Sequence, residues 1–186
     1  MTTNKRMRVG GTSDTFYQDW CFKVTSDVAN GNFEYTLDCP RPLRTPPPGR
    51  YYAIQVHSLT GLTNKFADRG STQEQYMSLS TTPRIGKDPF ITGPGDPDNI
   101  WYRLETFMFE LADDNYLHIK DSKSDKTPFT DDLGRGLLII GDHLYLQMTS
   151  TNTTVGHFPT LSCSIQYTFT TVSAADMIGE LASQIG

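Results

Sequence analysis

The sequence predicts an all-β protein in which two antiparallel sheets pack face to face, with a short helix or tail at the C-terminus. Apolar residues recur at every second position along most of the chain, which is the period of a strand with one buried face. Aromatic residues, which favour strands, make up 11% of the 186 residues. The intervening segments are rich in Gly, Pro, Asp and Asn, as is typical of turns and loops.

Eight segments carry the strand pattern. The first alternates Trp20, Phe22 and Val24 with more polar residues, and the other seven repeat this alternation with their own apolar residues. The seventh contains Gly141-Asp142, where we expect the strand to be broken. In chain order, the predicted strands cover residues 20–25, 33–37, 52–57, 76–80, 100–111, 116–120, 137–149 and 160–172.

The connections decide which β architecture these strands form. Asn30-Gly31 favours a tight turn, so we expect a hairpin between the first two strands. The other loops are too long and uneven for a barrel of short hairpins. Eight antiparallel strands with such loops fit a jelly-roll sandwich, the architecture that capsid and lectin domains share with cupins. Long loops on a β body often carry function, and the candidates here are residues 40–49, 82–99 and 121–136.

The last strand continues directly into a predicted helix. Its apolar and hydroxyl-bearing residues alternate from Leu161 to Phe169. Ser173-Ala174-Ala175-Asp176 then has the pattern of a capping box, which marks a helix N-terminus. A helix this short is marginal in isolation, so it must pack either on its own domain or on a neighbouring subunit. Self-packing is slightly favoured because the helix follows a strand directly. Its apolar residues at helical spacing are Met177, Ile178, Leu181 and Ile185.

The length and net charge of the chain limit the functions that it can have. A chain of this length suits one domain, with a short basic arm at residues 1–15, a single jelly-roll domain at 16–172 and a C-terminal tail at 173–186. The net charge of −5 argues against a surface dominated by phosphate binding. No apolar run is long enough to span a membrane, and the basic start of the chain does not resemble a secretory signal. We therefore predict no membrane partner.

Cysteine and histidine residues give no catalytic pattern. Cys21, Cys39 and Cys163 are an odd number without zinc-type spacing, so buried, reduced thiols are expected. A cupin-type metal site would need a His-x-His pair, which is absent, and each histidine alone is more often a surface or hydrogen-bonded residue. We predict no enzyme activity and no metal ligands among the four histidines, which are His57, His118, His143 and His157.

Three carboxylate pairs fall in predicted turns: Asp96 and Asp98, Asp113-Asp114, and Asp131-Asp132. Asp is common in turns because its side chain bonds the local backbone. Calcium prefers the same groups, but none of these pairs has the ligand spacing of an EF-hand. We predict no cofactor, and if a calcium ion is present we expect it to be shared at a subunit interface.

The end of the last strand and the tail resemble a known family. The segment Val172-Ser173-Ala174-Ala175-Asp176-Met177-Ile178-Gly179 is similar to the end of single jelly-roll capsid proteins of small viruses, most like those of circular, replication-initiator-encoding single-stranded DNA viruses. The resemblance implies a structural coat protein of the virion that self-assembles, inside the host cell, into an icosahedral shell enclosing the genome. Such capsids usually begin with a long arginine-rich arm.

Two sets of site residues follow from this reading. Lys5, Arg6 and Arg8 are all that this chain has of such an arm, and they are either a weak phosphate-binding segment or a solvated terminus. The predicted subunit contacts are the apolar tail residues Met177, Ile178, Leu181 and Ile185.

The alternative function is a lectin-like or carbohydrate-binding β-sandwich. It would need an exposed aromatic platform, for which the candidates are Tyr51, Tyr52, Trp101 and Tyr102. A cupin-like enzyme is the weakest reading, because its metal ligands are missing.

Overall fold

A computed structural model describes residues 16–63, 72–88, 90, 95–96, 98–111, 117–119, 125–130, 136–151 and 158–185. These residues form ten strands and one helix. The strands are β1 (Gln18–Thr25), β2 (Gly31–Asp38), β3 (Arg50–Thr63), β4 (Thr72–Ser80), β5 (Asn99–Leu111), β6 (Leu117–Ile119), β7 (Asp125–Pro128), β8 (Leu137–Ile139), β9 (His143–Thr151) and β10 (Thr160–Ser173), and the helix is α1 (Ala174–Ile185).

Early strands pair with late strands in reverse order. β1 pairs with β10, β2 with β9, β3 with β7 and β8, and β4 with β5, all antiparallel. The chain is therefore one long antiparallel hairpin. Further pairing of β10 with β3 and of β9 with β4 rolls this hairpin into two sheets. This is the jelly-roll arrangement, which confirms the predicted fold class.

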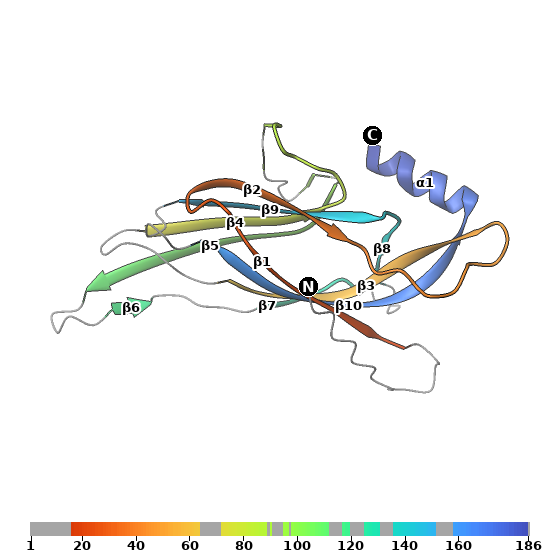
Figure 1. Cartoon of the computed structure of the whole chain (residues 1–186), viewed down its shortest axis with the longest axis horizontal. Helices are drawn as coiled ribbons and strands as arrows, with labels where there is room; N and C mark the ends of the chain where they lie inside the picture. Colours follow the sequence, from red (N-terminus) through yellow and green to blue (C-terminus); the bar gives the residue numbers. More distant parts are fainter. Residues whose placement is uncertain are drawn as a thin grey trace.

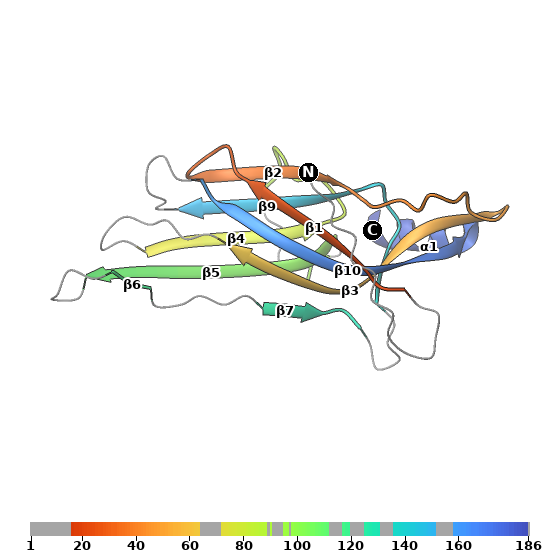
Figure 2. The ribbon, with the colours of Figure 1, turned by 60° about the horizontal axis from the view of Figure 1, so that its bottom comes forward.

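The two sheets form two layers. The first sheet has the order β1-β10-β3-β7, with β8 also paired to β3, and the second has the order β2-β9-β4-β5-β6. Figure 1 shows the layers one above the other, with α1 beyond the end of β10. In Figure 2 the strands β1, β10 and β3 cross those of the second sheet obliquely, as aligned sandwiches do.

The core lies between the sheets and contains the apolar residues predicted by alternation. Trp20, Phe22 and Val24 of β1 are buried, as are alternate residues of β10 and β9. Ile165 and Leu144 are completely buried. Burial of this kind stabilises the sandwich by roughly 1.5–3 kcal/mol for each large apolar side chain.

One sequence prediction about the strands was wrong. The Asn30-Gly31 turn does not close a hairpin, because β1 and β2 lie in different sheets. Gly31 does adopt a positive φ of 118°, so the dipeptide turns the chain from one sheet to the other. The break expected at Gly141-Asp142 in the segment 137–149 is confirmed, and the strands on its two sides, β8 and β9, lie in different sheets.

Candidate assembly surfaces

The capping box predicted at the start of α1 is present. The Ser173 hydroxyl donates to Asp176 Oδ2 (2.6 Å) and accepts from the Asp176 backbone N–H (3.2 Å). The same carboxylate accepts from the Ser173 backbone N–H (3.3 Å). Hydrogen bonds from the Ser173 hydroxyl and backbone lower the pKa of Asp176, because they favour its charged form. The helix start is therefore fixed by the sequence itself.

The helix α1 leaves an apolar side chain in solvent. Ile178 is 64% exposed, whereas Met177 is partly buried. The contacts of α1 are with the adjoining strands β10 and β3. Leu181 and Ile185 lie within the helix, but their side chains are outside the described residues, as are Lys5, Arg6 and Arg8. Among the described residues, no helix is long and apolar enough to cross a membrane.

A groove lies beside the start of β3, at the end of the molecule that carries α1. It has a volume of about 430 Å³ and is lined by Pro40, Pro42 and Pro46 of the β2–β3 connection and by Tyr52 and Phe169 of the first sheet. Leu43, in the same connection, is 98% exposed. The groove therefore combines an apolar lining with an apolar side chain that is almost fully exposed.

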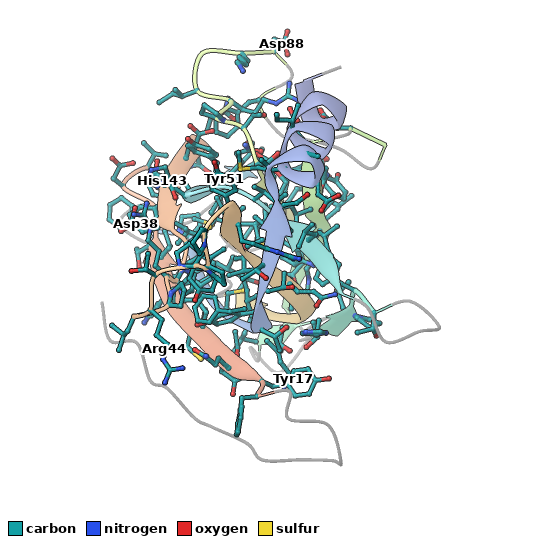
Figure 3. The ribbon with its side chains drawn as sticks, turned by 90° about the vertical axis from the view of Figure 1, so that its right-hand side faces the viewer. Tyr17, Asp38, Arg44, Tyr51, Asp88 and His143 are labelled. Atoms are coloured by element: carbon teal, nitrogen blue, oxygen red, sulfur yellow. The ribbon has the colours of Figure 1, made fainter. Side chains whose placement is uncertain are left out.

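Basic residues border this groove. Arg41 forms an exposed ion pair with Asp142 (2.8 Å), and Figure 3 shows Arg44 pointing away from the ribbon. In the same figure His143 lies beside Asp38, and its Nδ1 is 3.0 Å from the carboxylate. The segment 40–50 has three arginines and no acid, whereas α1 has two acids and no base. The two parts of this surface therefore have opposite charge.

A buried polar network covers the outer face of the second sheet. Gln147 of β9 is completely buried, although it points away from the core. It accepts a hydrogen bond from the Ser78 hydroxyl (2.6 Å) and donates to the Ser80 hydroxyl (2.8 Å) and the Thr82 carbonyl oxygen (3.3 Å). The start of the β4–β5 connection, at Thr82, is thereby bonded to the sheet.

Arg84 is the centre of the same network. Its backbone N–H donates to Glu34 Oε2 of β2 (2.5 Å), and its guanidinium forms an ion pair with Asp96 and lies 3.8 Å from Asp98. Asp98 also accepts from the Thr82 hydroxyl (2.6 Å). Asp96 accepts from the Asp98 backbone N–H (3.1 Å), which is the local turn role expected for this pair. No group of three His, Cys, Asp or Glu side chains suited to a metal ion occurs in the described residues.

The network presents a turn at the surface. The Lys87 N–H donates to the Arg84 carbonyl oxygen (2.9 Å), which closes a β-turn, and Gly86 has a positive φ of 75°. Ile85, at the tip, is 75% exposed. Figure 1 shows this connection projecting above β2, β9 and β4. We refer to residues 84–88 as the Ile85 turn.

The outer face of the first sheet has a shallow depression. It is lined by Cys21 and Lys23 of β1, Thr60 and Leu62 of β3, and Ser162 and Ser164 of β10. These are the residues that alternate with the core residues, and most of them are small. Leu62 is 53% exposed. We refer to this surface as the Leu62 depression.

The remaining predicted site residues have structural roles where they are described. Burial raises the pKa of Cys39 and of Cys163 to about 12, so these thiols are unreactive core residues. His57 is buried and its Nε2 lies 3.0 Å from the Thr168 hydroxyl. Trp101 is only 6% exposed and donates to the Thr127 hydroxyl (3.3 Å), so it is not available as a sugar-binding platform. His118, His157 and the pairs at 113–114 and 131–132 lie outside the residues whose side chains are described.

Comparison with known proteins supports the fold. No family model matches the chain, and no curated protein matches its sequence. The solved structure of Merkel cell polyomavirus VP1 in complex with disialyllactose matches with a TM-score of 0.52 and 9% identity, covering 92% of this chain and 100% of that one. Apo VP1 of New Jersey polyomavirus matches with a TM-score of 0.51 and 8% identity, covering 84% and 99%. The chain therefore has a jelly-roll fold similar to that of these viral capsid proteins.

Proposed function

We propose that this chain is a coat subunit of a viral capsid, with a structural and non-catalytic role. The fold similarity to two polyomavirus VP1 proteins supports this class of function. It agrees with the resemblance of the segment 172–179 to single jelly-roll capsid proteins, for which a closed icosahedral shell around the genome is the expected assembly. The assignment to single-stranded DNA viruses rests on that resemblance alone.

The observation that carries the proposal is the exposed apolar surface around α1. Ile178 of α1 and Leu43 of the β2–β3 connection are both exposed. Figure 1 shows α1 and this connection at the same end of the molecule. Exposed apolar side chains that gather at one end of a molecule, near an apolar groove, are typical of a surface that binds another protein. In a shell, a neighbouring subunit would cover Met177, Ile178, Leu181 and Ile185, and weak contacts repeated many times are enough for assembly.

Contact with the genome is proposed to be weak. Lys5, Arg6 and Arg8 can neutralise a few phosphates, which gives a low and salt-sensitive affinity. Removing residues 1–9 should therefore lower the nucleic acid content of the particles without preventing their formation. Unchanged nucleic acid content would remove these three residues from the proposal.

Sedimentation of the purified chain tests the subunit role. The wild-type chain should form large particles, and Ile178→Asp should shift the equilibrium toward free subunits by about 10- to 100-fold, because burying one isoleucine stabilises an interface by roughly 1.5–3 kcal/mol. Ser183→Asp adds the same charge on the side of the helix that, by helical spacing, lies opposite the apolar residues, and it should assemble normally. Equal assembly of the wild type and Ile178→Asp would exclude α1 as a contact, and a wild type that stays monomeric would refute the coat function.

A further inference from the structure

The described residues of the β4–β5 connection are bonded to one another and to the second sheet by buried side chains. Four charged residues, Glu34, Arg84, Asp96 and Asp98, converge beneath it, together with the completely buried Gln147. Ionised groups are costly to remove from water, and each of these four has at least one hydrogen-bond or ion-pair partner, although Arg84 Nε and Asp98 Oδ1 are buried without one. The result is a fixed turn that exposes the apolar side chain of Ile85.

A fixed turn is suited to insertion into another surface. Ordering a flexible loop in an interface makes association less favourable, because the loop loses conformational entropy. A turn that is already ordered avoids this cost. The exposed side chain at its tip is apolar, whereas Lys87 and Asp88 beside it are charged and exposed. An apolar centre with a charged rim is the usual composition of a protein-binding surface.

The Leu62 depression has the complementary properties. Leu62 provides an exposed apolar floor, and Cys21, Ser162 and Ser164 are small enough to let another chain approach the sheet. Lys23 stands at its edge on β1, and Asp19 lies on the same outer side of that strand. Asp88 and Lys87 of the turn thus have oppositely charged partners available on β1.

The two surfaces cannot meet within one molecule. The Ile85 turn lies on the outer face of the second sheet, whereas the Leu62 depression lies on the outer face of the first. They are therefore on opposite sides of the sandwich. A contact between them requires two copies, joined head to tail, and such a contact leads to a ring when the rotation between copies closes.

We propose that the Ile85 turn of one subunit docks into the Leu62 depression of the next subunit, and that this head-to-tail contact builds the rings from which the shell forms. The inference rests on the proposed coat function and names the surfaces that this function uses. It is separate from the contact made by α1, which lies at one end of the molecule.

The chain's own thiol allows a direct test. Cys21 lines the depression, whereas Cys39 and Cys163 are buried, so Ile85→Cys should form a disulfide with Cys21 of the adjacent subunit under mild oxidation. Each copy has one thiol on each face, so non-reducing gels should show dimers, trimers and higher species up to the size of the closed ring. The double variant Ile85→Cys, Cys21→Ser should show none of these species.

The outcomes separate the inference from the coat function. If the wild type forms particles but Ile85→Cys is not linked to Cys21, the docking contact is wrong and the coat function stands. Linked dimers that persist in the double variant would mean that two Ile85 turns meet each other, which also overturns the proposal. If the wild type remains monomeric, the coat function itself fails.

A second variant measures the strength of the contact without cross-linking. Ile85→Asp should weaken assembly by about 10- to 100-fold, the amount expected for loss of one buried isoleucine. Ile85→Val keeps most of the apolar area and should assemble nearly as the wild type does. Equal assembly of the Asp and Val variants would overturn the proposal, and circular dichroism checks that both are folded.

Discussion

Replacing Arg84 with methionine should destabilise the subunit through the network beneath the β4–β5 connection. The side chains of Arg84, Asp96 and Asp98 are 16%, 20% and 15% exposed, so the substitution leaves two largely buried carboxylates without their cation. Removing one member of a buried pair costs about 3–5 kcal/mol, and the remaining exposure of these groups reduces this to about 2–3 kcal/mol. The melting temperature should fall by about 4–12 °C for a domain of this size.

The chain contains a matched control for this measurement. Arg41 and Asp142 form an ion pair of 2.8 Å whose side chains are 69% and 67% exposed. Arg41→Met should cost less than about 1 kcal/mol, because solvent screens an exposed pair. Urea unfolding of the unassembled subunit compares the two variants. If Arg84→Met costs no more than Arg41→Met, the network does not hold the Ile85 turn in place.

Three further predictions concern other parts of the fold. Burial lowers the pKa of His57 below its usual 6.5, so at lower pH the unfolded chain binds more protons than the folded chain, and the free energy of unfolding should fall as the pH drops below about 6.5. Between pH 7 and pH 5 this free energy should fall less in His57→Gln than in the wild type. An identical fall in the two proteins would contradict this role of His57. Ser173→Ala removes the cap of α1 and should cost about 1 kcal/mol of helix stability, visible as faster amide exchange in the helix, whereas Ser183→Ala should not. Gly136→Ala would place a Cβ 2.2 Å from the Val56 carbonyl oxygen and should destabilise the domain by about 1–3 kcal/mol in urea unfolding, and a neutral effect would show that this connection can move.

The strands and the cap could be predicted because their signals are local. Alternation places Trp20, Phe22 and Val24 on one face whichever strand lies beside them, and the Ser173–Asp176 cap needs only four consecutive residues. The lengths of the strands were predicted less well, since β3 continues to Thr63, well past its predicted end at residue 57. Its register with β10 shifts where Gln166 faces Ser58 and Tyr167 faces Val56, and the extra residue there interrupts the alternation.

Other features depend on residues far apart in the chain. β7 has the sequence Asp-Lys-Thr-Pro, which shows no apolar alternation, and it is a strand because it pairs with β3 at the sheet edge. The Arg84 network joins β2, β4, β9 and the β4–β5 connection, so its members cannot be grouped before the topology is known. A polar residue such as Gln147 at an outward position predicts solvent exposure, and the connection that covers it reverses that expectation.

The sequence predicted that α1 packs its apolar residues against another surface, with a slight preference for its own domain. The described contacts of the helix are with β10 and β3 of its own domain, whereas Ile178 is exposed, so the cover of Ile178 by a neighbouring subunit belongs to the proposed function. The Ile85 turn and the Leu62 depression had no sequence signal beyond lying in a long loop and on the hydroxyl-rich face of a strand.

Cryo-electron microscopy of the purified wild-type chain tests the coat function most directly. We expect closed particles of uniform size in which each jelly roll contacts its neighbours through α1 and through the docking of Ile85 at Leu62. Reconstruction at side-chain resolution would show both contacts. A chain that remains monomeric at every salt concentration and pH, or particles whose subunits leave both surfaces in solvent, would contradict this expectation.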